Sequence, residues 1–149
     1  MQGGSISMSI REKAKKYFVQ GKYNCCQAVI SAYCDEYRID DSVIFAMTEG
    51  FGLGMGGLKE TCGAVTGMFM AIGLHNSAAD KSDPRKTKMQ TYEDIRNAAK
   101  EFEKQCGSIY CRDLKANTDA DGTQIVGCDR CVELVAEYVE KYIVESGKN

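Results

Sequence analysis

Apolar side chains recur at helical spacing along most of the chain. Between residues 9 and 20 they fall one and two turns apart, at Ile10, Ala14, Tyr17 and Phe18. This spacing places them on one face of a helix, which Ser9 or Ser7 can cap and which Gly21 can end. The pattern therefore predicts an amphipathic helix over residues 9–20.

Two more helices and a loop are predicted next. Asn24 is a favoured N-cap residue, and helically spaced apolar positions follow it for about three turns. A shorter helix, with Asp40 or Asp41 as its cap, extends to Met47. Glycines then accumulate over residues 50–57, which favours a loop because glycine weakens a helix.

Two further helices have clear boundary signals. Thr61 is a suitable cap for a helix over residues 62–74, which carries bulky apolar side chains. Asp83-Pro84 favours the start of the next helix, because proline is well tolerated at the first helical position. Its apolar pattern continues for about five turns, and Gly107 is expected to end it.

The last helix is predicted from Gly127 or Cys128 to Val144, after a short turn and a polar loop. No alternating run is long enough for a strand, and the chain shows no internal repeat. We therefore expect an all-α fold. Residues 9–146 would form a single-domain bundle of five to six helices, with the glycine-rich loop preceding the Cys62 helix.

The composition excludes two classes of partner. The 19 basic and 21 acidic side chains nearly balance, and no run of Lys or Arg forms a site for nucleic acid. The longest apolar window, residues 64–74, is much shorter than the ~20 residues of a membrane span.

Residues 1–8 lack the features of a signal peptide, so we expect a cytoplasmic protein. Their Gly-Gly-Ser texture suggests an N-terminal extension, with Met8 as the natural start and an expression remnant before it.

Eight cysteines are the unusual feature of the composition. In a reducing cytosol this number favours metal binding or thiol chemistry over a disulfide framework. Cysteine is also a common small core residue, and about half of the eight are expected to have only that role. Cys34 lies on the apolar side of its helix, and Cys106 is at a helix end that disfavours a thiolate, so both fit the core role.

Three cysteines fall at predicted helix starts: Cys25, Cys62 and Cys128. Free N–H groups and the helix dipole stabilise an anion there, so a thiol pKa of ~8.5 can fall toward ~7. A thiolate is both a nucleophile and a metal ligand. Cys128 also begins a C-x-x-C with Cys131, although Cys131 could equally be a core residue.

Small residues follow Cys62 on one helix face: Gly63, Ala64 and Gly67. Such a face permits either close contact with another helix or the approach of a cofactor or second thiolate to the backbone. The sequence leaves both explanations open. His75 is the only histidine, and it falls near a predicted helix end, which weakens a Cys-His zinc site or nucleophile pair.

These motifs, which form a C…CGAxxG…C…C pattern, resemble the C_GCAxxG_C_C family of small redox-active proteins. The similarity covers nearly the whole chain from about Ile10. It is carried by the segments YNCCQAV from residue 23, ETCGAVTG from residue 60 and CRDL from residue 111, and by a final cysteine before the last helix. The resemblance implies that the four family cysteines are Cys25, Cys62, Cys111 and Cys128. The others are then extras, and Cys26 stands where the family more often has alanine.

Three functions are compatible with this pattern. The first is a thiol redox protein, as in a thiol oxidoreductase, in which Cys62 or Cys25 attacks and a neighbouring sulfur resolves the mixed disulfide. The second is a zinc or iron-sulfur module that uses the same four thiolates, with Gly63, Ala64 and Gly67 admitting the cofactor. Ligands so widely spaced differ from those of zinc ribbons and ferredoxins. The third is a helical interaction protein whose cysteines only pack in the core.

The resemblance also bears on the partners. It implies a redox partner protein or a transporter-associated system, because family members are often described near transporter genes. A homodimer is compatible with the sequence. The substrate and the electron donor are not encoded in any recognisable motif.

Overall fold

Eight α-helices and one 3-10 turn make up the computed structural model, which describes residues 8–146 of the chain. No strand occurs in this range, only two isolated β-bridges, so the predicted all-α class is confirmed. The predicted extension over residues 1–8 lies outside the described residues except for Met8. In chain order the elements are α1 (Ile10–Val19), α2 (Cys25–Glu36), α3 (Ser42–Met47), η1 (Glu49–Phe51), α4 (Gly52–Met55), α5 (Gly63–Asn76), α6 (Lys88–Cys106), α7 (Cys111–Ala116) and α8 (Cys128–Glu145).

Local capping explains where the first two helices begin, as predicted. The Ser9 hydroxyl accepts the Glu12 N–H at 3.0 Å, and the Glu12 carboxylate accepts the Ser9 N–H at 3.2 Å. Asn24 and Gln27 form the same reciprocal pair, at 2.8 and 3.0 Å. Each cap contributes about 1 kcal/mol to helix stability. The second one fixes Cys25 as the first residue of α2.

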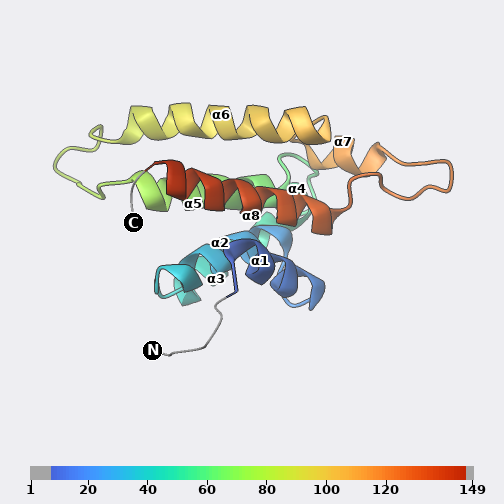
Figure 1. The fold of residues 1–149 in the computed structure, drawn as a ribbon, viewed down its shortest axis with the longest axis horizontal. Helices are drawn as coiled ribbons and strands as arrows, with labels where there is room; N and C mark the ends of the chain where they lie inside the picture. The colour runs from blue at the N-terminus through green and yellow to red at the C-terminus, as the bar shows by residue number, and fades with distance from the viewer. Residues whose placement is uncertain (1–7, 147–149) are drawn as a thin grey trace.

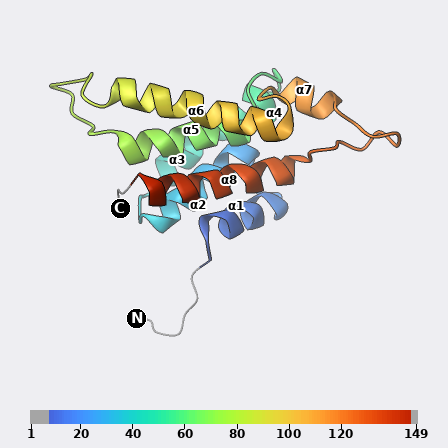
Figure 2. The ribbon, with the colours of Figure 1, turned by 45° about the horizontal axis from the view of Figure 1, so that its top comes forward.

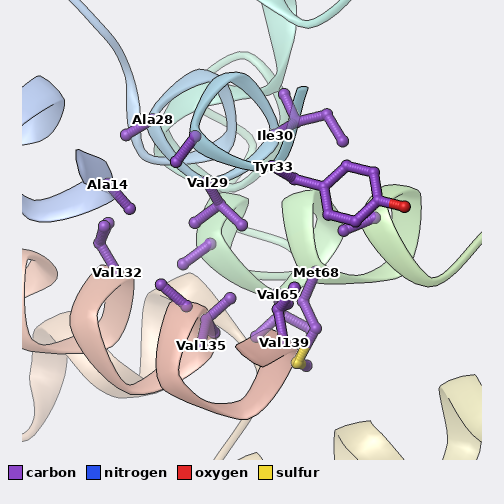
Figure 3. Packing of buried hydrophobic residues seen from close by; sticks show 14 of the residues in the cluster. Ala14, Ala28, Val29, Ile30, Tyr33, Val65, Met68, Val132, Val135 and Val139 are labelled. Carbon is purple, nitrogen blue, oxygen red and sulfur yellow. The ribbon is translucent and has the colours of Figure 1, made fainter. Parts of the chain in front are cut away.

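The core lies where α1, α2, α5 and α8 meet, as Figure 3 shows. Figure 1 shows α6 along one side of α5 and α8, and α1 to α3 on the other. The two views agree that the segment between α7 and α8 extends away from the helices (Figure 2). The labelled core residues are Ala14 of α1, Ala28, Val29, Ile30 and Tyr33 of α2, Val65 and Met68 of α5, and Val132, Val135 and Val139 of α8. Burying one such valine or isoleucine is worth about 1.5–3 kcal/mol.

Gly67 allows α2 and α5 to approach closely. A Cβ at this position would lie 3.0 Å from the carbonyl oxygen of Cys26 and 3.0 Å from the Cβ of Val29. Ala64 is completely buried in the same core. For these two residues the structure shows helix packing, one of the two explanations that the sequence left open. Their role in binding a cofactor stays a prediction.

Two predicted helix starts are wrong. Thr61 does not cap α5, because it pairs with Tyr110 in a β-bridge and leaves Cys62 as the N-cap residue. Pro84 does not begin α6, which starts at Lys88. The Asp80 carboxylate accepts the backbone N–H and the hydroxyl of Ser82, at 3.0 and 2.6 Å. Such side-chain bonds favour turns over a helix, so they help to hold the residues just before α6 in turns.

The glycine-rich segment, predicted as a loop, contains η1 and the short element α4, which is a left-handed turn. Leu53, Gly54 and Met55 have φ values of 53°, 65° and 69°. A Cβ at Gly54 would lie 2.7 Å from the backbone nitrogen of Glu60 and 2.7 Å from the Cβ of Cys111. Only glycine therefore fits there, and its absent side chain brings the turn against α7. Left-handed backbone costs about 1–2 kcal/mol per ordinary residue, so the turn is strained at Leu53 and Met55.

Candidate functional site

Cysteines at the starts of four helices line one cavity of about 500 Å³. They are the four that the resemblance selects, Cys25, Cys62, Cys111 and Cys128. The remaining lining residues are Phe18, Asn24, Glu49, Gly52, Leu53, Gly54, Gly56, Gly57, Gly63 and Lys115. Folding thus brings residues from positions 25 to 128 to a single site with a largely apolar wall. Their catalytic role remains a prediction.

Each of these cysteines lies at a helix start. Cys25, Cys111 and Cys128 are the first residues of α2, α7 and α8, and Cys62 immediately precedes α5. Free N–H groups and positive dipole ends therefore lie near the cavity, which favours negative charge on sulfur. The sequence predicted this setting for all but Cys111. Its helix has only six residues and no side-chain cap, and Asp113 in its first turn is the one local signal of a helix start.

Cys62 is the thiol best suited to ionise at neutral pH. Its pKa falls to about 7, chiefly because the Cys131 thiol donates a hydrogen bond to it. Burial opposes this shift, while nearby N–H groups of α5 and the positive charge of Lys115 support it. The Cys62 side chain makes no capping hydrogen bond of ordinary geometry to α5, so these N–H groups act as nearby dipoles.

Other thiols are held in the neutral form. The pKa of Cys25 is raised to about 12, chiefly by burial and then by the charges of Cys62 and Cys128. Burial also raises the pKa of Cys111, against the opposing effect of Lys115. The remaining α2 cysteines, Cys26 and Cys34, are completely buried and have raised pKa values of about 11. Their burial fits the core role that about half of the cysteines were expected to have.

Gly63 brings the Cys25 sulfur next to the start of α5. A Cβ at Gly63 would overlap the Cys25 sulfur and would lie 2.9 Å from the carbonyl oxygen of Phe51. The absent side chain thus makes room for the Cys25 sulfur beside Gly63, the residue that follows Cys62 in the chain. The approach of the Cys25 sulfur, rather than contact between helices alone, therefore explains why residue 63 is a glycine. The Asn24 side chain fixes the same region by donating to the carbonyl oxygens of Thr48 and Glu49, at 3.2 and 3.1 Å.

Lys115 is a functional candidate that the sequence did not reveal. Its ammonium group lies 3.7 Å from the Cys128 sulfur, and among residues 8–146 it is the one basic side chain that lines the cavity. Lys115 is four residues after Cys111, so both lie on one face of α7. That spacing is a signal only once α7 is known to be a helix. Gln124 also contacts the Cys128 sulfur, at 4.0 Å.

A family model described as "Putative redox-active protein (C_GCAxxG_C_C)" matches residues 23–142 of the chain. The chain belongs to this family. No curated protein and no solved structure matches it.

The name C_GCAxxG_C_C places Gly-Cys before the alanine, whereas this chain has Cys62-Gly63. The packing of Gly63 against Cys25 explains why a larger residue is not accommodated there.

The cavity of this C_GCAxxG_C_C protein does not provide a ready metal site. In the described range, no three His, Cys, Asp or Glu side chains are placed to hold a metal ion, and all eight cysteines are free thiols. The side-chain positions therefore do not fit the four-thiolate geometry of zinc or a cluster. His75 bonds instead to Ser146, at 2.7 Å, and does not line the cavity.

No helix between residues 8 and 146 has the length and apolar character to cross a membrane.

Proposed function

We propose that this protein is a thiol–disulfide redox protein in which Cys62 attacks a disulfide at the cavity and Cys25 resolves the product. One observation carries the proposal: Cys25 and Cys62 line the same cavity, and the Cys25 sulfur occupies the space left by the absent side chain of Gly63, the residue after Cys62. The two cysteines differ strongly in acidity, which suits an attacking and a resolving thiol.

The first step uses the ionised sulfur. The Cys62 thiolate attacks one sulfur of the substrate disulfide, so that a mixed disulfide forms and the other substrate sulfur leaves as a thiolate. Lys115 and the helix starts around the cavity stabilise negative charge at this stage. The substrate is then bound to Cys62 through one sulfur.

The second step releases the substrate. Cys25 gives up its proton and attacks the Cys62 sulfur, the Cys25–Cys62 bond forms, and the second substrate thiolate leaves and takes the proton. The Cys62 charge is one cause of the raised pKa of Cys25, and this charge is lost once Cys62 is in the mixed disulfide. The resolving thiol is therefore easier to ionise after the first step than before it. In total, two electrons pass from the protein dithiol to the substrate disulfide.

The cavity suits a small disulfide or an extended segment of a larger one. Its volume of about 500 Å³ is within the range of small-molecule sites, roughly 300–1,000 Å³. Leu53, exposed at the cavity wall, adds apolar surface for such a ligand. A redox partner protein or transporter-associated system would act as the donor or acceptor of electrons, and this assignment stays a prediction.

Oxidation of the reduced protein with an excess of a small disulfide tests the proposal. Proteolysis and mass spectrometry are expected to find Cys25 joined to Cys62, and dithiothreitol is expected to reverse the bond. Cys62→Ala should lose this cross-link, whereas Cys34→Ala, at a buried position that does not line the cavity, should keep it. If Cys62 stays a free thiol under full oxidation, the proposal is wrong.

A further inference from the structure

Two charged side chains of opposite sign line the cysteine cavity. Among residues 8–146 they are Glu49, which begins η1, and Lys115 of α7. Apart from the amide of Asn24, the rest of the lining is apolar, sulfur or glycine. A ligand in this cavity therefore meets one positive and one negative group on a largely apolar wall.

Lys115 keeps hydrogen-bonding capacity for a ligand. Its side chain is half-buried, and no ion pair within the described range includes it. Its ammonium group lies 3.7 Å from the Cys128 sulfur. A thiol is a weak acceptor, whereas an ammonium group has three donors. A carboxylate inside the cavity would be a stronger partner for Lys115 than this sulfur is.

Glu49 supplies the opposite charge. Its side chain is exposed, and its carboxylate takes part in none of the ion pairs that join residues of the described segment. The bond from Asn24, at 3.1 Å, ends on the backbone carbonyl oxygen of Glu49 and leaves the carboxylate accessible. This carboxylate can therefore accept a hydrogen bond from a cationic group of a ligand.

The other polar groups of the cavity wall are used within the fold. The N–H groups of Cys62 and Cys111 donate to backbone carbonyls of other segments, at 2.8 and 2.6 Å. The Asn24 side chain donates to two carbonyl oxygens and accepts a backbone N–H. Recognition of a polar ligand therefore depends mainly on Lys115 and Glu49.

We infer that the cavity takes a small disulfide of the amino-acid type, in which each half carries a carboxylate and an ammonium group close to its sulfur. Lys115 binds a carboxylate, Glu49 binds an ammonium group, and the disulfide lies at Cys62. This inference rests on the proposed function, because it names the substrate class of that same site. The reaction balances as before: two electrons and two protons from Cys25 and Cys62 convert the disulfide into two amino-acid thiols, and the Cys25–Cys62 bond forms.

Four small disulfides separate the two charges. Cystine carries both groups, 3,3′-dithiodipropionate lacks the ammonium groups, cystamine lacks the carboxylates, and 2-hydroxyethyl disulfide carries neither. Stopped-flow measurement at pH 7 gives the rate constant of thiol release by the reduced protein for each compound. Each value is divided by the rate constant with dithiothreitol, which corrects for the different leaving thiols. The corrected value for cystine is expected to exceed that for 2-hydroxyethyl disulfide by about tenfold or more.

Variants assign each charge to its side chain. Lys115→Met should lower the corrected values for cystine and dithiodipropionate about tenfold relative to 2-hydroxyethyl disulfide. Its effect on the Cys62 thiolate slows all four compounds alike and cancels in this ratio. Glu49→Gln should lower cystine relative to dithiodipropionate by about two- to fivefold, because an exposed pair is weaker. Lys141→Met, outside the cavity, should leave all ratios unchanged.

The unmodified chain keeps the test independent of any folding defect in the variants. Its preference for cystine over 2-hydroxyethyl disulfide should decrease as salt is raised, since salt screens charge pairs. Equal corrected values for all four compounds, or a preference for cystamine, would overturn the amino-acid class and leave the proposed function standing. Failure to reduce any of the four would overturn the proposed function itself.

Discussion

Replacing Cys62 by serine is expected to slow the reaction of the reduced protein with a small disulfide at pH 6 by about tenfold or more. With a pKa of about 7, Cys62 provides far more thiolate at this pH than an ordinary cysteine with a pKa of ~8.5. Its lower intrinsic nucleophilicity offsets only part of that advantage. Stopped-flow measurement of thiol release gives the rate.

The pH profile distinguishes loss of the nucleophile from a general defect. The wild-type rate should rise with pH and level off above about 7, because the pKa of Cys62 sets its thiolate fraction. Cys62→Ser should lose this midpoint and keep rising to higher pH. Cys34→Ala removes a thiol that is completely buried and has no cavity contact, so it should retain the wild-type profile. An unchanged profile in Cys62→Ser would show that another sulfur attacks.

Gly63→Ala is expected to destabilise the fold by about 1–3 kcal/mol and to prevent the Cys25–Cys62 disulfide. The new methyl group would overlap the Cys25 sulfur and crowd the Phe51 carbonyl oxygen, so α2 and α5 must move apart at the cavity. Thermal unfolding should show a lower Tm by several degrees. Peptide mapping after oxidation should show Cys25 and Cys62 no longer joined.

Gly73→Ala is the matched control in the same helix. Beyond the neighbouring backbone of α5 itself, no atom lies within 4 Å of a Cβ at Gly73, so alanine should be neutral there or stabilise α5 by up to about 1 kcal/mol. Disulfide formation should remain normal. If both variants behave alike, Gly63 is not needed for the approach of the two sulfurs.

The sequence was most informative where a helix start depends on neighbouring residues. The capping pairs of Ser9 and Asn24 use side chains only three positions away, so α1 and α2 began where expected. The start of α8 at Cys128 was also predicted. Thr61 failed as a cap because a distant residue, Tyr110, pairs with it. The left-handed turn at Gly54 likewise depends on contact with Cys111, which is not visible in local sequence.

The candidate site was predictable in part. Helix-start reasoning found three of the four cavity cysteines, and resemblance added Cys111. Lys115 was missed because its position relative to the sulfurs depends on the packing of the short helix α7. The predicted fall in thiol pKa at helix starts is wrong for Cys25, whose pKa burial raises although it begins α2. Only the fold shows which thiols are buried and which line one cavity.

Site-resolved alkylation of the native reduced protein across a pH series tests the central claim most directly. Quantified by peptide mass spectrometry, Cys62 should react with a midpoint near pH 7, while Cys25 should show no ionisation below about 10. Lys115→Met removes a positive charge that lowers the Cys62 pKa, so the midpoint should move to higher pH. Lys141→Met, at an exposed site that does not line the cavity, should not move it. A Cys62 midpoint at ~8.5 or above, unaffected by Lys115→Met, would contradict the account.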